Sequence, residues 1–160
     1  MLRPGRDDDA PGIIALITDC WLEYPGCVMD LDGENPELRA LASYFSARDG
    51  ALWVAEDAGE IVGVVGVKSL GGDEWELCRM YVAAPLRGNG LADQLAASVF
   101  AFVQAQGGVR LALWSDTRFT RAHRFYERHG FLRGPDVRTL HDLSQTMEYG
   151  YARIFRNIES

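Results

Sequence analysis

Hydrophobic residues recur along the chain with two different spacings, and segments with one spacing alternate with segments of the other. Spacings of three and four residues predict helices with one buried face. Such spacings occur in the ranges 7–22, 35–45, 88–106 and 119–129. Apolar runs rich in β-branched and aromatic residues predict strands. These runs cover 1–4, 51–57, 61–70, 74–82, 109–114, 131–140 and 145–155. The predicted order is therefore β-α-α-β-β-β-α-β-α-β-β.

Residues at the ends of the predicted helices support these boundaries. Pro11 and Pro36 stand in first turns, where the fixed φ of proline suits the helix and its missing N–H leaves no bond unmade. Asn35 can cap the second helix. Gly130 follows the last helix and is a typical stop residue.

The order of the elements predicts the fold class. A strand–helix–strand unit between residues 74 and 114 requires a parallel pair with a right-handed crossover. The turn Asp57-Ala58-Gly59 predicts an antiparallel hairpin. No internal repeat or low-complexity segment interrupts the pattern. We therefore expect an α/β fold with one central mixed β-sheet and helices on both faces, in a single domain over residues 1–160.

Composition narrows the classes of function. The 160 residues include 23 acidic and 16 basic side chains, and the net charge of −7 disfavours binding to nucleic acid. No apolar window reaches the roughly 18 residues of a membrane span, and the first residues lack an apolar signal core. Cys20, Cys27 and Cys78 form no CxxC pair, which indicates reduced thiols rather than a disulfide or a metal site. We expect a cytoplasmic protein that binds neither membrane nor metal.

Two glycines lie where strand 74–82 leads into the next helix, in the turn Arg87-Gly88-Asn89-Gly90. The first amides of a helix lack partners and, with the helix dipole, attract anions. Glycine lets an anion approach the backbone, and the Arg87 fork suits phosphate. The turn therefore predicts a phosphate site, and the plainer alternative is a glycine-rich turn with an exposed arginine. It is neither a P-loop nor a dinucleotide motif, because no Gly-Lys-Ser/Thr follows and Asp93 replaces the third glycine.

Two stretches together resemble the GNAT superfamily of acetyl-CoA-dependent N-acetyltransferases. The stretch ELCRMYVAAPLRGNGLADQL is similar to that family's strand followed by Arg/Gln-x-x-Gly-x-Gly/Ala, here Arg87-x-x-Gly90-x-Ala92. The stretch AHRFYERHGF is similar to the family's helix end. Phe119 stands where many members carry an asparagine, and Ala84 stands where many carry a proline.

The resemblance implies a GNAT-like fold and acetyl-CoA as co-substrate. In that fold the strand at 74–82 separates from the strand at 109–114, and the acyl arm of the cofactor fills the gap. Backbone groups near Met80 and Val82 would hold this arm, and the turn with the first helical residues would hold the pyrophosphate. The implied cofactor-binding residues are Met80, Val82, Arg87, Gly88, Asn89, Gly90, Leu91 and Ala92.

Glu76 is the candidate general base. The two-residue period of a strand predicts that Glu76, Cys78, Met80 and Val82 share one face, which makes Glu76 a carboxylate on an apolar face. Some members of the resembled family place a base glutamate at this position. The alternative is a glutamate that reaches solvent or an arginine, with a chain of water molecules as the base.

Tyr126 is the candidate general acid. By resemblance it corresponds to the tyrosine that protonates the departing thiolate of the cofactor. The alternative is a core tyrosine at helical spacing, because it shares a helix face with Phe119 and Ala122.

These features predict an N-acetyltransferase that moves an acetyl group from acetyl-CoA to a primary amine of a small molecule or amino acid by direct attack. A non-catalytic module that binds or senses acyl-CoA is the alternative, and a nucleotide-binding regulator is a third reading. The resemblance also allows a homodimer.

Overall fold

A computed structural model describes residues 1–155 and contains one seven-stranded sheet and four α-helices within them. The strands are β1 (Leu2–Pro4), β2 (Ala51–Asp57), β3 (Glu60–Gly71), β4 (Glu74–Val82), β5 (Arg110–Asp116), β6 (Leu132–Thr139) and β7 (Met147–Ile154). The helices are α1 (Ala10–Leu22), α2 (Leu41–Ser46), α3 (Leu91–Ala105) and α4 (Thr120–Arg128). The predicted α/β class and element order are confirmed.

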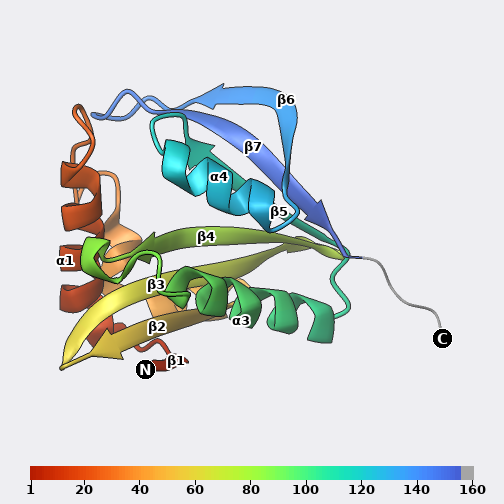
Figure 1. Ribbon diagram of the computed structural model, residues 1–160, viewed down its shortest axis with the longest axis horizontal. Coiled ribbons are helices and arrows are strands. Elements are labelled where there is room, and N and C mark those ends of the chain that lie inside the picture. The colour runs from red at the N-terminus through yellow and green to blue at the C-terminus, as the bar shows by residue number, and fades with distance from the viewer. Residues whose placement is uncertain (156–160) are drawn as a thin grey trace.

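The strands are arranged in the order β1-β2-β3-β4-β5-β7-β6 (Figure 1). Only the β4–β5 pair is parallel, and it is joined by the crossover helix α3, as the sequence predicts. All other neighbours are antiparallel. Within residues 1–155 no helix is long and apolar enough to cross a membrane.

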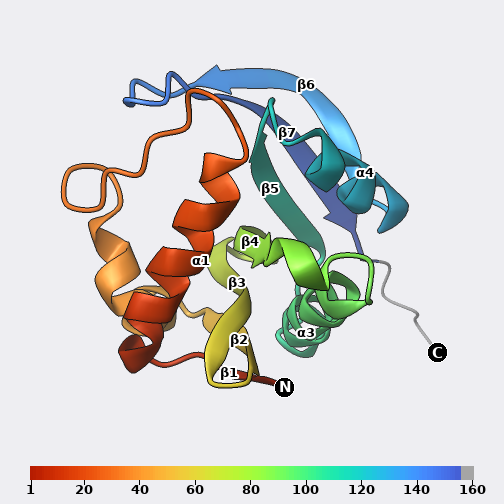
Figure 2. The ribbon, with the colours of Figure 1, turned by 60° about the vertical axis from the view of Figure 1, so that its left-hand side comes forward.

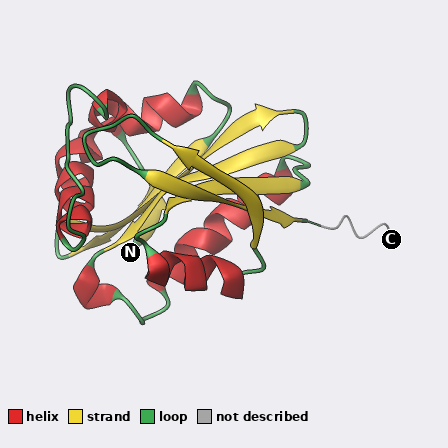
Figure 3. Cartoon of the chain, turned by 90° about the horizontal axis from the view of Figure 1, so that it is seen from above, coloured by secondary structure: helices red, strands yellow, loops and turns green. Residues whose placement is uncertain are grey.

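Helices cover both faces of the sheet (Figures 2 and 3). Helix α1 buries Ile13, Leu16, Ile17 and Cys20 at the expected helical spacing, against a cluster shared with α2, β2 and β3. Helix α3 buries its own apolar stripe in a second cluster, which also contains residues of α4, β5 and β7. Each fully buried Leu or Ile side chain contributes about 1.5–3 kcal/mol to these clusters.

Strands β4 and β5 pair only at their first residues. Glu74, Trp75 and Glu76 are matched with Arg110, Leu111 and Ala112, and no further pair follows. Beyond this point the two strands run apart, as Figure 1 shows at the centre of the sheet. Strand β5 keeps its partner β7 along its whole length. The separation implied by the resemblance is therefore confirmed.

A β-bulge at Arg79 corrects one prediction about faces. Arg79 has a left-handed backbone (φ 56°), and the β3–β4 register shifts between Val64 and Gly66. The extra residue reverses the alternation beyond it. Cys78 and Tyr81 consequently pack on the α1 side, whereas Met80 and Val82 pack on the α3 side. Glu76, Cys78, Met80 and Val82 therefore do not share one face, and that prediction was wrong.

The start of α3 is also later than predicted. The helix begins at Leu91, and Gly90 is its N-cap in a left-handed conformation (φ 82°). Gly88 is left-handed as well (φ 83°). Both glycines thus belong to the turn, and the free amides of the helix are those of the residues that follow them.

Candidate active site

Two cavities lie along β4 beyond the point where it leaves β5. The first measures about 400 Å³ and is bordered by α1, β4, β5, β7 and the loops after α1 and β6. The second measures about 430 Å³ and is bordered by the end of β4, the turn before α3, and α4. The residues that line both cavities are Met80, Tyr81, Phe119, Ala122 and Tyr126. The two cavities therefore meet at Tyr126.

The first cavity is acidic. Its basic lining residues are Lys68, Arg79 and Arg138. Its acidic lining residues are Glu34, Glu37, Glu76, Asp116, Asp142 and Glu148. Each of the three basic side chains is paired with one acidic residue of the same cavity. Asp116 is paired with Arg118, just outside the cavity, at 2.8 Å. The remaining surplus of two carboxylates favours a positively charged ligand.

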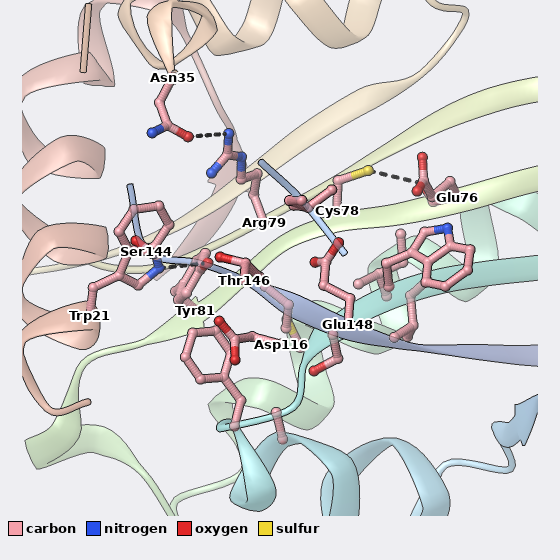
Figure 4. A pocket seen from close by; sticks show the side chains of 18 of the residues that line it. Trp21, Asn35, Glu76, Cys78, Arg79, Tyr81, Asp116, Ser144, Thr146 and Glu148 are labelled. Atoms are coloured by element: carbon pink, nitrogen blue, oxygen red, sulfur yellow. Dashed lines mark hydrogen bonds between the residues drawn. The ribbon is translucent and has the colours of Figure 1, made fainter. Parts of the chain in front are cut away.

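Glu76 lies in this first cavity, on the α1 side of β4 (Figure 4). Its carboxylate is 3.2 Å from the Lys68 ammonium, and its side chain is only 14% exposed. Burial lowers the pKa of Lys68, but the charge of Glu76 and neighbouring groups outweighs burial, so the net pKa of Lys68 is raised. Lys68 therefore stays cationic beside the Glu76 carboxylate.

Glu148 is a second half-buried glutamate in the first cavity, and the sequence reasoning missed it. It is 14% exposed on β7 and accepts a hydrogen bond of 2.7 Å from Nε of Arg138. The Arg138 guanidinium lies over the ring of Trp114, 4.4 Å from its centre. Figure 4 shows Glu148 pointing into the cavity. Position 148 lies in a half-exposed strand, so a glutamate there looks like an ordinary surface residue. The other residues of the cavity that it faces are far away in sequence, and the sequence alone therefore does not mark Glu148 as a site residue.

Cys78 also lines the first cavity, but it is a poor nucleophile. Burial raises the pKa of its thiol to about 12, and the charge of Glu76 adds to that shift. At neutral pH the reactive thiolate form is therefore negligible. A covalent acetyl-cysteine step at this position is disfavoured.

The second cavity is basic, and most of its other lining residues are apolar. Its single acidic lining residue within the described part of the chain is Asp93. Its basic lining residues are Arg87, Arg121, Arg124 and Arg128. Asp93 is turned toward α4, where His129 donates to it at 2.7 Å and Arg128 at 3.2 Å. The hydrogen bond with His129 lowers the pKa of Asp93 and leaves the carboxylate occupied.

The turn before α3 fits a phosphate group. A Cβ atom added to Gly88 or Gly90 would meet nothing within 4 Å, so the space above both backbones is open. The free amides of Leu91, Ala92 and Asp93 begin the helix at this place. The residues present therefore fit the pyrophosphate of CoA.

Arg87 has a different role in the turn from the one its sequence position suggests. Its Nε donates to the Val82 carbonyl oxygen at 3.1 Å, and its Nη1 donates to Glu23 at 2.8 Å. Its charge is thus compensated by Glu23, and the side chain fixes the turn to the end of β4 and to α1.

The other predicted cofactor-binding residues fall into two groups. Those that line the second cavity are Met80, Val82, Gly88, Gly90 and Ala92. Asn89 is exposed and Leu91 faces the core, so neither lines it.

Tyr126 is buried on α4 between the two cavities, with 6% of its surface exposed. Burial raises the pKa of its phenol, and the nearby Tyr81 and Cys78 add to the effect. Its hydroxyl has no hydrogen-bond partner among residues 1–155, whereas the Tyr81 hydroxyl accepts a hydrogen bond of 2.9 Å from Trp21. Tyr126 is therefore a protonated donor that faces an open site.

His123 belongs to the core and lines neither cavity. Burial lowers the pKa of His123, which stacks on Tyr151 in the core and contacts the Asp116 carbonyl oxygen at 2.9 Å. In residues 1–155 no group of three His, Cys, Asp or Glu side chains is placed to hold a metal ion.

Comparisons with known sequences agree on one family. Residues 13–131 match the family described as "Acetyltransferase (GNAT) family". The chain is 33% identical over 128 residues to the "Uncharacterized N-acetyltransferase YjgM" of Escherichia coli (strain K12), which covers 77% of this chain and 76% of that protein. It is 32% identical over 113 residues to "N-acetylaspartate synthetase" of Danio rerio, which covers 70% of this chain but 39% of that protein.

Solved structures share the fold. An acetyltransferase of the GNAT family from Staphylococcus aureus Mu50 superposes with a TM-score of 0.83 at 19% identity, over 98% of this chain and 99% of that chain. An aminoglycoside 6′-N-acetyltransferase complexed with coenzyme A superposes with a TM-score of 0.73 at 17% identity, over 100% and 99%. At such identities the likeness shows the fold alone.

The open turn generates a first testable prediction. Gly90→Asn adds a side chain to the space where a phosphate would lie, while asparagine tolerates the left-handed backbone. We expect affinity for CoA, measured by calorimetry, to fall at least about tenfold, or about 1.4 kcal/mol. Gly59→Asn is the matched control, because Gly59 has nearly the same φ (81°), equally open surroundings and no place in either cavity. Equal CoA affinity in the two variants would contradict a phosphate site at Gly90.

Proposed function

Because the chain belongs to the acetyltransferase (GNAT) family and is therefore an acyltransferase, we propose that it transfers an acetyl group from acetyl-CoA to a primary amine. The acceptor is a small molecule or amino acid that is positively charged at the reacting end, and the amine attacks the acetyl group directly.

The observation that carries this proposal is the opposite charge of two joined cavities. CoA bears phosphate groups, and the second cavity presents Arg121 and Arg124 in addition to Arg87 and Arg128, which are paired with Glu23 and Asp93. An amine is protonated at neutral pH, and the first cavity presents six carboxylates, of which Glu34 and Asp142 have no ion-pair partner within residues 1–155. Each cavity thus attracts one of the two substrates, and the shared residues around Tyr126 mark where they would meet.

The edge of β4 fits the acyl arm of the cofactor. Beyond Glu76 this edge has no strand partner on the β5 side. Apart from the Val82 carbonyl oxygen, which accepts from Arg87, its backbone groups are therefore open to pair with the amides of an extended ligand. Met80 and Val82 project toward the α3 side at this edge and line the second cavity. In our proposal these backbone groups hold the arm and polarise the acetyl carbonyl.

The first cavity would bind the acceptor and remove its proton. Glu148 is placed to attract the ammonium group, because its carboxylate points into the cavity. Glu76 is our candidate for the base that takes the proton and leaves a free lone pair on nitrogen. The raised pKa of Cys78 favours direct attack over an acetyl-enzyme intermediate.

Tyr126 would complete the reaction. The departing thiolate of CoA needs a proton, and the buried phenol keeps its own proton at neutral pH until charge develops on sulfur. The free hydroxyl at the junction of the cavities makes it the described side chain best placed for this task.

The direct test is turnover. The purified chain is mixed with acetyl-CoA and a panel of polyamines, amino acids, aminoglycosides and neutral alcohols, and released thiol and acetylated product are measured. We expect product only with amines, and lower KM for acceptors with extra positive charge than for acidic amino acids. Binding of acetyl-CoA without thiol release for any acceptor would instead identify a non-catalytic acyl-CoA module.

Tyr126→Phe tests the proposed acid. The variant keeps the packed ring and leaves no orphaned partner, so we expect stability to change by less than about 1.5 kcal/mol. We expect kcat to fall about 10- to 1000-fold with nearly constant KM for acetyl-CoA, because the hydroxyl acts mainly in the transition state. A wild-type rate, or a change in melting temperature alone, would make Tyr126 a core residue only.

Glu76→Gln and Glu148→Gln together identify the base. For Glu76→Gln we expect kcat at pH 7 to fall about 100-fold, with a defect that shrinks as the pH approaches the pKa of the amine. For Glu148→Gln we expect mainly a higher acceptor KM, by about tenfold, because ammonium binding is weakened. The reverse pattern in the two pH–rate profiles would assign the base role to Glu148, and intact rates in both would leave water as the base.

A further inference from the structure

Helix α4 presents three arginines to the second cavity at spacings of three and four residues. Arg121, Arg124 and Arg128 all line it, so one side of the helix forms a basic ridge along the cavity. The chain as a whole carries a net charge of −7. A concentration of positive charge at one cavity is therefore a local feature and does not follow from composition.

The ridge is unfavourable for the helix itself. Arg124 and Arg128 are like charges one turn apart, which destabilises an isolated helix by a few tenths of a kcal/mol. Arg121 lies in the first turn, where the helix dipole disfavours a cation, whereas Arg128 lies in the last turn, where the dipole favours one. The local cost therefore falls on Arg121 and on the contact between Arg124 and Arg128. These two departures from local preference point to a functional demand on this side of the helix.

The basic side chains of the second cavity differ in how far they are already neutralised. Arg87 is paired with Glu23 at 2.8 Å, and Arg128 with Asp93 at 3.2 Å. Arg121 lies 3.7 Å from the same Glu23 carboxylate and is 57% exposed. Arg124 has no ion-pair partner within residues 1–155. Arg121 and Arg124 therefore keep most of their charge available to a ligand.

CoA has a phosphate group that the turn before α3 does not account for. The open glycines and three free amides fit a pyrophosphate. The 3′-phosphate is a separate monoester that carries about −1.5 to −2 charges at pH 7. We propose that Arg121 and Arg124 bind this 3′-phosphate, so that the protein distinguishes CoA from 3′-dephospho-CoA. This inference rests on the proposed use of acetyl-CoA.

The arginine fork gives a physical basis for such discrimination. Guanidinium groups bind phosphate oxygens with paired, charge-assisted hydrogen bonds. Both side chains are exposed, so their contribution is screened by salt and is largest at low ionic strength. The same contact can be broken from either side. 3′-Dephospho-CoA lacks the phosphate group but keeps the acyl arm, and substitution of the two arginines deletes the protein groups that would bind that phosphate.

The experiment compares CoA with 3′-dephospho-CoA by calorimetry at low salt, with the full chain. We expect the wild type to bind CoA at least about tenfold more tightly, or about 1.4 kcal/mol. The double variant Arg121→Gln, Arg124→Gln should bind the two ligands alike and keep the wild-type affinity for 3′-dephospho-CoA. Arg110→Gln is the matched control for loss of positive charge, because Arg110 lines neither cavity, and it should retain the preference for CoA.

Three results would overturn the inference. Equal binding of the two ligands by the wild type would show that the 3′-phosphate is not recognised. A preference retained by the double variant would place that recognition elsewhere. A double variant that keeps its melting temperature but loses affinity for both ligands alike would assign the arginines to the pyrophosphate. If the wild type bound neither ligand, the proposed function would be contradicted as well as the inference. That result can be told apart from the other three, in which the wild type still binds CoA.

Discussion

The separation of β4 from β5 is the constraint on which the rest of the site depends. Pairing ends at Glu76 and Ala112, although both strands continue for several residues. An edge of backbone N–H and C=O groups cannot stay dry without partners, so the gap must hold water or a ligand rich in amides. Helix α4 covers the gap on one face and supplies Tyr126. The sheet thus leaves room for an extended ligand without any loss of its core.

Much of the fold was predictable because each element carries a local signal. Helical spacing and the crossover rule predicted the order, and the β4–β5 pair was recovered as parallel. The predicted cap at Asn35 was wrong, because its side chain makes no cap hydrogen bond and α2 begins only at Leu41, after a 3₁₀ turn. The bulge at Arg79 was missed because both faces of β4 are apolar there. A signal did exist: residues of the α3-side core fall at Trp75 and Leu77 and then at Met80 and Val82, so their spacing breaks between 77 and 80.

The candidate site was less predictable, because it joins residues that are distant in sequence. The resemblance pointed to Glu76 and Tyr126, and the structure places both at the first cavity. Glu148 and its partner Arg138 lie on the last two strands, where they look like an exposed cross-strand pair. The arginines of α4 likewise resemble an ordinary solvated helix face. Only the folded arrangement shows that the acidic and basic groups gather around two different cavities.

The opposite charges of the two cavities together favour one order of product release in the proposed reaction. Acetylation turns a cationic ammonium into a neutral amide, so the product loses its attraction to the carboxylates around Glu148. CoA keeps its phosphates after transfer and keeps its attraction to the basic cavity. In the proposed reaction the acidic cavity would therefore bind the amine better than its acetylated product. The charge pattern favours release of the acetylated product before CoA, and Tyr126 lies at the boundary across which this difference in affinity arises.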